Sequence, residues 1–228
     1  LFPRATGKYI AMCEGDDYWT DPLKLQKQVD FLESNPEYSM CFHAAEIKNE
    51  TTTRIITTCQ NIEEKEYFTN DIFPGWVVPT ASVVYRRSMV DSFPPLKNAH
   101  WIKYGDIVLF LKCTHVGRVW GMKNQMSVYR MTSNGAVVSQ CLDPKSEEKV
   151  CKHYQFLMQN FPQLNREWPS RYIAQHYYTK FRSSKHIYGI IKYKRNDTPI
   201  LKAVKLTNFA NALTSIMLTQ IVLLDTYA

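Results

Sequence analysis

The sequence lacks the features that mark several common classes of protein. None of its six cysteines stands in a C-x-x-C pair, so a zinc ribbon is not indicated. It contains no internal repeat and no low-complexity tract. The apolar stretch at residues 209–224 carries no charge, but it is shorter than the roughly 20 residues that span a bilayer. Its polar interruptions favour a packed terminal helix, with an interfacial membrane helix as the alternative.

Negative charge is in deficit. The chain has 28 Lys and Arg against 21 Asp and Glu, a net charge of +7. Such an excess favours nucleic acid, an anionic membrane surface or a phosphate-bearing ligand. No nucleic-acid-binding module accompanies the charge, so nucleic acid is not predicted as a partner. Basic residues gather between positions 180 and 205, which is typical of a solvated helical face and also permits peripheral membrane contact. The scattered thiols predict a cytoplasmic location, with the inner face of the membrane as the alternative site.

The hydrophobic pattern predicts an α/β fold up to about Val138 and an all-α extension after it. Strands are expected at residues 8–13, 38–45, 54–59, 81–85, 119–122 and 126–129. Helices are expected at residues 22–35, 63–73, 87–93, 105–117, 145–160, 169–185 and 199–224. The predicted organisation is therefore a mixed sheet with helices at residues 1–138 and a helical extension at residues 139–228.

The helix expected at residues 22–35 has a cap at Thr20 or Asp21 and Pro22 in its first position. Its apolar stripe predicts packing on the sheet through Leu25, Val29 and Leu32. The residues expected to face water are Lys24, Lys27, Asp30 and Glu33.

An acidic loop, residues 14–17 (Glu-Gly-Asp-Asp), follows the first expected strand. In open α/β sheets, ligands bind outside the carboxyl ends of the strands. The loop is not an EF-hand, because counting from Asp16 places Asp21 where Gly is required and Lys27 where Glu is required. By themselves these residues leave open a solvated turn or a hydrolase with paired carboxylates.

The surrounding sequence narrows these alternatives. The run GKYIA, then EGDDYW, then DPLKL, continuing through Gln28, Phe31 and Leu32, resembles the centre of the family 2 glycosyltransferases of bacterial polysaccharide synthesis. That family has a GT-A fold with a D-x-D motif at a strand end. The resemblance implies that the motif holds Mg²⁺ or Mn²⁺ against the diphosphate of a nucleotide-sugar donor. It makes Glu14, Asp16 and Asp17 the metal-site residues, with Asp16 the most direct ligand.

The same resemblance implies a general base. In the family, an acid at the start of an acceptor-side helix takes the proton from the attacking hydroxyl. Asp106 matches that place, with Gly105 where Glu is more usual. The alternative interpretation is that Asp106 only caps the helix or complements its dipole.

Further positions are expected to bind substrate. The stretch from Val78 to Ser88 resembles the strand beneath the acceptor site, which makes Thr80 and Ser82 candidates. Arg130 lies in a stretch that relatives write Y-R-x-H, and Thr132 stands where they have His. Trp76 and Trp101 are candidate platforms for a sugar ring. For the hydroxyl and indole side chains, ordinary packing is the alternative.

The resemblance covers about residues 4–135 and implies that nucleotide-binding strands come before this point, so we expect an N-terminally truncated domain. The implied activity is inverting transfer of a sugar from a nucleotide-diphospho-sugar to a hydroxyl of a saccharide or lipid-linked saccharide. The alternative is an inactive fragment or pseudoenzyme that keeps the fold as a binding or structural module. Glu14, Thr132 and the expected truncation favour that alternative.

Overall fold

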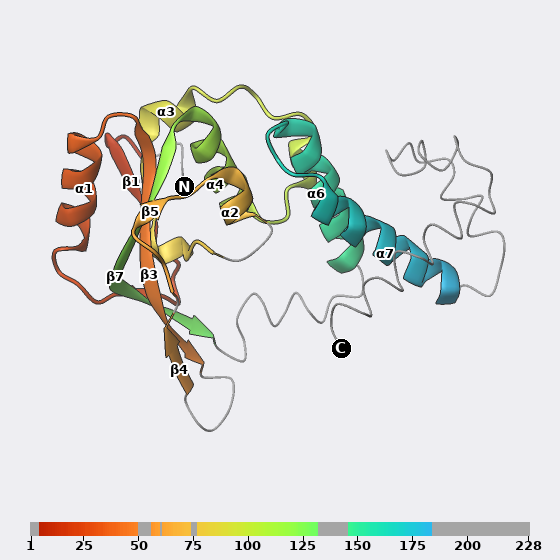
Figure 1. Cartoon of the computed structure of the whole chain (residues 1–228), viewed down its shortest axis with the longest axis horizontal. Helices are drawn as coiled ribbons and strands as arrows, with labels where there is room; N and C mark the ends of the chain where they lie inside the picture. The colour runs from red at the N-terminus through yellow and green to blue at the C-terminus, as the bar shows by residue number, and fades with distance from the viewer. Residues whose placement is uncertain (1–4, 50–55, 60, 74–76, 132–145, 184–228) are drawn as a thin grey trace. The chain divides into compact units, whose positions relative to one another are not determined.

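The computed structural model describes residues 5–49, 56–59, 61–73, 77–131 and 146–183 (Figure 1). The chain divides into two compact units, residues 1–169 and 170–228. Helix α7 (Glu167–Ser183) spans the division. The domain boundary predicted near Val138 lies outside the described residues and stays a prediction. Within the described part of the chain, no helix combines the length and hydropathy needed to cross a membrane.

The first unit is built on a mixed sheet whose two long central strands, β3 and β7, run parallel to each other. Among the described residues the strand order is β1-β6-β3-β7-β2, with β4 added to β3 and β5 added to β7. All the other pairs are antiparallel. The strands are β1 (Tyr9–Ala11), β2 (Tyr18–Trp19), β3 (Tyr38–Asn49), β4 (Ile56–Cys59), β5 (Lys65–Glu66), β6 (Val84–Arg86) and β7 (Arg118–Met131).

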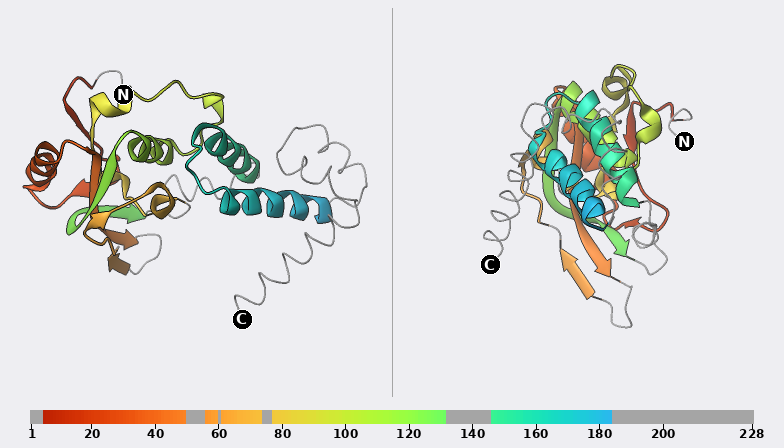
Figure 2. Two further views of the ribbon diagram at one scale, coloured as in Figure 1. Left: turned by 45° about the horizontal axis from the view of Figure 1, so that its top comes forward. Right: turned by 90° about the vertical axis from the view of Figure 1, so that its right-hand side faces the viewer.

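Helices cover both faces of this sheet, as two views of the ribbon show (Figures 1 and 2). Helix α1 (Lys24–Ser34) packs on one face, where Leu32 meets Cys41 of β3. Helix α4 (Gly105–Val116) packs on the other, where Phe110 meets Met40 and Phe42. Alternate residues of β3 point to opposite faces, so one strand serves both cores. The shorter elements are α2 (Thr69–Ile72), α3 (Arg87–Asp91), η2 (Thr80–Ser82) and η3 (Ala99–Trp101).

The predicted fold class is confirmed: a mixed α/β sheet with helices is followed by helical chain. Helices α6 (Ser146–Asn160) and α7 match the helices expected at residues 145–160 and 169–185. Strand β4, expected at residues 54–59, forms at Ile56–Cys59 and pairs antiparallel with the end of β3 (Figure 1). The helix expected at residues 199–224 lies outside the described residues.

Three local predictions need correction. Residues 63–73 were expected to form one helix, but they form strand β5 and then the single turn of α2, because β5 pairs with Trp120 and Gly121 of β7. The two strands expected at 119–122 and 126–129 are one strand, β7, that pairs with β3 across register shifts at His43 and Ala44. The strand expected at 81–85 begins only at Val84, after a 3-10 turn.

The buried face of α1 also differs from the prediction. Lys24 was expected to face water and Leu25 to pack, yet Lys24 has no exposed surface and Leu25 is 40% exposed. Nζ of Lys24 donates a hydrogen bond to Oε1 of Gln28 at 2.8 Å and lies 4.4 Å from the centre of the Trp19 ring. A long aliphatic stem with a hydrogen bond and an aromatic ring at its end tolerates burial. Leu32 is fully buried, as predicted.

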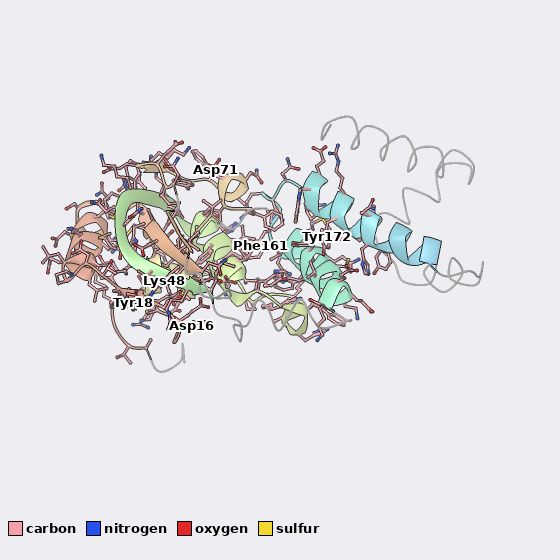
Figure 3. All side chains as sticks on the ribbon, turned by 90° about the horizontal axis from the view of Figure 1, so that it is seen from below. Asp16, Tyr18, Lys48, Asp71, Phe161 and Tyr172 are labelled. Carbon is pink, nitrogen blue, oxygen red and sulfur yellow. The ribbon has the colours of Figure 1, made fainter. Side chains whose placement is uncertain are left out.

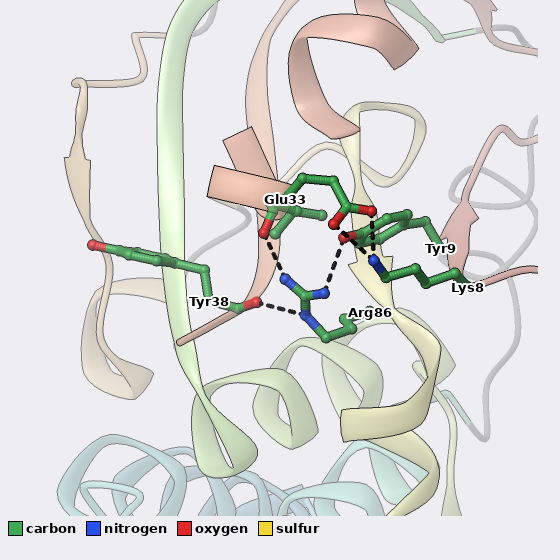
Figure 4. A network of polar contacts seen from close by, with 6 residues as sticks. Lys8, Tyr9, Glu33, Tyr38 and Arg86 are labelled. Carbon is green, nitrogen blue, oxygen red and sulfur yellow. Dashed lines mark hydrogen bonds and ion pairs between the residues drawn. The ribbon is translucent and has the colours of Figure 1, made fainter. Parts of the chain in front are cut away.

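One guanidinium ties the edge of the sheet to α1 (Figure 4). Arg86 of β6 donates to the Tyr9 hydroxyl at 2.9 Å, the Leu32 carbonyl at 2.6 Å and the Tyr38 carbonyl at 3.4 Å. Beside it, Lys8 forms an exposed ion pair with Glu33. Arg86 thereby joins β1, β3 and the C-terminal turn of α1, which fixes the strand that leads into the acidic loop.

Candidate functional site

The acidic loop is held at both ends by the sheet. After β1, the Met12 amide donates to the Val83 carbonyl at 3.1 Å, and the Asp17 amide closes a turn on the Glu14 carbonyl at 3.2 Å. The chain then enters β2, which pairs antiparallel with Ser127 and Val128 of β7. Figure 3 labels Asp16 and Tyr18 in this segment. The loop thus passes from the edge strand β1 to the opposite edge of the sheet, and its conformation is set by backbone pairing on each side.

Trp19, which follows the acidic loop, is held by two contacts of its indole ring. Its Nε1 donates to the Ala81 carbonyl at 2.9 Å, and its ring contacts the Lys24 ammonium. Ala81 belongs to η2, the turn that also carries Thr80 and Ser82. The indole therefore connects the acidic loop with η2, although these segments lie more than 60 positions apart in the sequence.

The Asp17 carboxylate faces β7, where a backbone N–H group donates to it. Its Oδ1 accepts the backbone N–H of Arg130 at 2.9 Å. Burial raises the pKa of the Asp17 carboxyl, the Arg130 hydrogen bond opposes that rise, and the Asp16 charge adds to it. The structure therefore brings together Asp17 and Arg130, which were predicted to belong to the metal and substrate sites.

The Glu14 carboxyl is influenced by several of the other predicted groups. Its pKa is raised first by burial and then by the charges of Asp17, Asp106 and Asp16, while a hydrogen bond from the Thr80 side chain opposes the rise. Asp106 is therefore near enough for its charge to act on the Glu14 carboxyl. Thr80, predicted to bind substrate, contacts Glu14 in the structure.

Asp106 lies in the first turn of α4, but it does not cap the helix. The N-cap residue is Tyr104, and no side chain makes the capping hydrogen bond. A carboxylate in the first turn still interacts favourably with the helix dipole. Of the alternative interpretation, capping is excluded, whereas a favourable interaction with the helix dipole is compatible with the structure. The Asp106 charge also acts on Glu14 and Tyr129.

Tyr129 belongs to this site and was not among the predicted residues. Burial raises the pKa of its phenol, and the charges of Asp17, Glu14, Asp16 and Asp106 raise it further. All four carboxylates influence Tyr129. A signal was present in the sequence, because Tyr129 directly precedes Arg130 in the stretch that resembles Y-R-x-H.

The carboxyl groups of the acidic loop do not by themselves enclose a metal ion. Among the described residues, no three Asp, Glu, His or Cys side chains gather closely enough to enclose a metal ion. Mg²⁺ commonly binds through one or two carboxylates together with substrate phosphates and water. The pKa values of Glu14 and Asp17 are raised by loss of solvation and by like charges beside them, an arrangement that a cation would relieve, although Glu14 as a whole residue is exposed. Asp16 is exposed and Asp17 half-buried.

The other predicted residues have varied positions. Ser82 is fully buried and its hydroxyl donates to the Pro79 carbonyl at 2.6 Å, so its contact with substrate stays a prediction that this geometry does not favour. Trp101 is 39% exposed, with Nζ of Lys152 lying 4.2 Å from its ring centre and the His100 ring at 4.6 Å. Neighbouring groups therefore occupy part of the surface predicted to stack on sugar. Trp76 and Thr132 lie outside the described residues.

Comparison with known proteins gives a partial picture. No protein-family model matches the sequence. The chain is 35% identical over 132 residues to uncharacterized proteins of Mycobacterium bovis and Mycobacterium tuberculosis. These matches cover 58% of this chain and 37% of the length of each relative. The chain therefore spans little more than a third of the relatives it matches. Among solved structures, residues 1–349 of S. aureus TarS in complex with UDP are similar, with a TM-score of 0.47, 12% identity, and coverage of 80% of this chain and 50% of that one.

Proposed function

We propose that this chain carries the metal and acceptor side of a glycosyltransferase that moves a sugar from a nucleotide diphosphate to an acceptor hydroxyl. The observation that supports the proposal is that the charges of Glu14, Asp16, Asp17 and Asp106 all act on the phenol of Tyr129. The sequence resemblance assigned these four acids to one site from two segments about 90 positions apart. Family 2 membership and the inverting outcome belong to this proposal.

In the proposed reaction, Asp106 is the general base. A carboxylate within hydrogen-bond reach of the acceptor hydroxyl takes its proton as the oxygen attacks the anomeric carbon, and the nucleoside diphosphate leaves from the opposite side. Attack from that side inverts the anomeric configuration. Proton transfer of this kind contributes about 10²–10⁴-fold in rate.

The acidic loop would hold Mg²⁺ or Mn²⁺ through Asp16 and Asp17, with Glu14 supporting the loop through Thr80. A divalent cation neutralises negative charge on a departing diphosphate. The half-buried side chain of Arg130 adds positive charge beside Asp17, which suits a phosphate-bearing ligand. The proposed acceptor is a saccharide or lipid-linked saccharide, which would place the protein in the cytoplasm at the membrane face.

A second candidate is a pseudoenzyme that binds without turnover. The absence of a closed cluster of metal ligands among the described residues favours it. It predicts donor or acceptor binding with no release of nucleoside diphosphate, whatever the metal supplied.

The test uses the full-length gene product with Mn²⁺, a panel of nucleotide-diphospho-sugars and a measurement of nucleoside diphosphate release. The Asp106→Asn variant should lose about 10²–10⁴-fold in rate, and Asp16→Asn should lose the stimulation by Mn²⁺. Asp30→Asn, a change of an exposed acid on α1, is the matched control and should keep the wild-type rate. Equal rates for wild type and Asp106→Asn would discard the base assignment, and no turnover by any form would favour the pseudoenzyme.

A further inference from the structure

Helix α6 contacts the segment that leads into the helix of Asp106. At the start of this segment, residues 97–104, Asn160 of α6 accepts the Lys97 amide at 2.8 Å and donates to the Lys97 carbonyl at 3.0 Å. The side chain of Asn98, the next residue, donates to Oε1 of Gln159 at 2.9 Å. The C-terminal turn of α6 therefore holds the beginning of the segment through three hydrogen bonds.

The end of the segment is held by an earlier turn of α6. Nδ1 of His153 accepts the backbone N–H of Lys103 at 3.3 Å, and the ring of Tyr104 packs edge-on against the His153 ring with centres 5.2 Å apart. Nζ of Lys103 donates to the Ser146 hydroxyl. Tyr104 is the N-cap of α4, and Asp106 follows in its first turn. The contact with His153 therefore falls at the point where the chain enters the helix of the proposed base.

The protonation of His153 is fixed by its surroundings. The side chain has no exposed surface, and burial lowers its pKa to about 4, with the Lys103 charge acting in the same direction. The imidazole is therefore neutral at neutral pH and carries a single proton. Because Nδ1 accepts the Lys103 N–H, that proton is on Nε2.

Nε2 of His153 has no hydrogen-bond partner among the described residues. A buried donor without a partner is unfavourable for stability. An apolar side chain of similar size would avoid this cost while keeping the contacts with Tyr104 and Phe156. What such a side chain would lack is the acceptor at Nδ1, so the hydrogen bond from Lys103 is the feature that histidine provides.

We infer that His153 is a positioning residue for Asp106, acting through the Lys103 amide, and that α6 is part of the acceptor-side machinery; this inference rests on the proposed function. The start of α4 has no capping side chain of its own, so the hydrogen bond to His153 sets where the helix begins. A general base must lie within hydrogen-bond reach of the hydroxyl that it deprotonates. A displacement of about 1 Å from that geometry costs roughly 10²-fold in rate.

Two variants of the full-length gene product test the inference. His153→Phe keeps an aromatic ring and removes the acceptor, whereas His153→Asn keeps an acceptor close to the position of Nδ1. Each is measured for amide hydrogen exchange at Lys103 and at residues 104–107, for kcat, and for the KM of the nucleotide-sugar donor. Rates are normalised to the folded fraction determined from thermal melting.

In His153→Phe we expect faster exchange at Lys103 and a loss of kcat of roughly 10- to 100-fold with the donor KM unchanged, because the side-chain hydrogen bonds of the acidic loop and of Trp19 go to β7 and η2. In His153→Asn we expect protection at Lys103 and most of kcat to return. A role in stability alone would lower the melting temperature of both variants and leave kcat per folded molecule unchanged, which would overturn the inference.

Failure of the positioning role and failure of the proposed function give different results. If wild type transfers sugar and Asp106→Asn does not, but His153→Phe keeps full kcat, the positioning role is wrong and the proposed function stands. If wild type transfers no sugar, the proposed function fails and the positioning role falls with it. The exchange result then still decides whether His153 holds the entry to α4.

Discussion

The buried ammonium of Lys24 gives a stability prediction whose size follows from the structure. Burial lowers its pKa from 10.5 to about 8, and the hydrogen-bond acceptor beside it, Oε1 of Gln28, is uncharged. In the unfolded chain the same amine keeps its ordinary pKa. Between these two values the unfolded state binds more protons than the folded state, so the free energy of unfolding rises with pH over that range.

Each pH unit between the two pKa values is worth about 1.4 kcal/mol. From pH 7 to pH 9 only the last unit lies above the folded pKa, so the Lys24 contribution should increase by about 1.4 kcal/mol. Other groups titrate in the same range, and a comparison with Lys24→Met cancels them. Methionine fills a similar volume without a charge.

The assay is guanidinium unfolding of wild type and Lys24→Met at pH 7, 8 and 9. The unfolding free energy of wild type minus that of Lys24→Met should rise by about 1.4 kcal/mol over this range. The matched control is Lys27→Met, which removes an exposed lysine from the same helix and should follow wild type apart from a constant offset. A wild-type minus Lys24→Met difference that stays flat with pH would refute the reasoning.

Three further predictions concern the frame of the site and the acidic loop. Arg86→Ala should lower the unfolding free energy by about 2 kcal/mol, because it removes three hydrogen bonds from a charged group. In the same chemical-unfolding measurement, Arg86→Lys should restore little of this loss, since one ammonium does not reach all three oxygens. Gly121→Ala should cost about 2 kcal/mol, because the added Cβ would meet the Tyr67 ring and lie 3.0 Å from the Glu63 carbonyl oxygen; an unchanged melting temperature would show that Tyr67 moves aside freely. Mn²⁺ affinity, measured by calorimetry, should weaken on acidification, because protonated carboxyls do not bind the ion. The pKa values of Glu14 and Asp17 are raised above their ordinary 4.5 and 3.8, so the loss should begin at a higher pH than for unperturbed carboxyls. Affinity that stays constant until the pH reaches 4.5 would contradict this.

Local signals in the sequence were sufficient for the elements that frame the site. The apolar strand before the acidic loop, the helix after Pro22 and the helix that begins at Gly105 all form close to their predicted positions, because each has its own periodicity and its own end signals. The predicted cap is wrong, since the N-cap of α1 is Leu23 and the helix begins at Lys24, not at Pro22. The two acidic segments were assigned to one site by a family resemblance, and the electrostatic influence of Asp106 on Glu14 agrees with that assignment.

What the sequence did not reveal depends on contacts between distant segments. Strand β5 forms because its two residues pair with Trp120 and Gly121 of β7, and a segment of two residues has no periodicity of its own. Lys24 is buried because the Trp19 ring, which lies outside the helix, covers it. The role inferred for His153 depends on the Lys103 backbone, 50 positions earlier. A pattern of side chains along one helix contains no information about such partners.

The central claim is that the acidic loop binds a divalent ion close to Asp106, and paramagnetic broadening by Mn²⁺ tests it most directly. In amide spectra of the protein titrated with Mn²⁺, the signals of Asp106 and Tyr129 should disappear together with those of residues 14–17. They should persist in Asp16→Asn and disappear as in wild type in Asp30→Asn. Broadening that leaves Asp106 untouched, or that is unchanged by Asp16→Asn, would contradict the account.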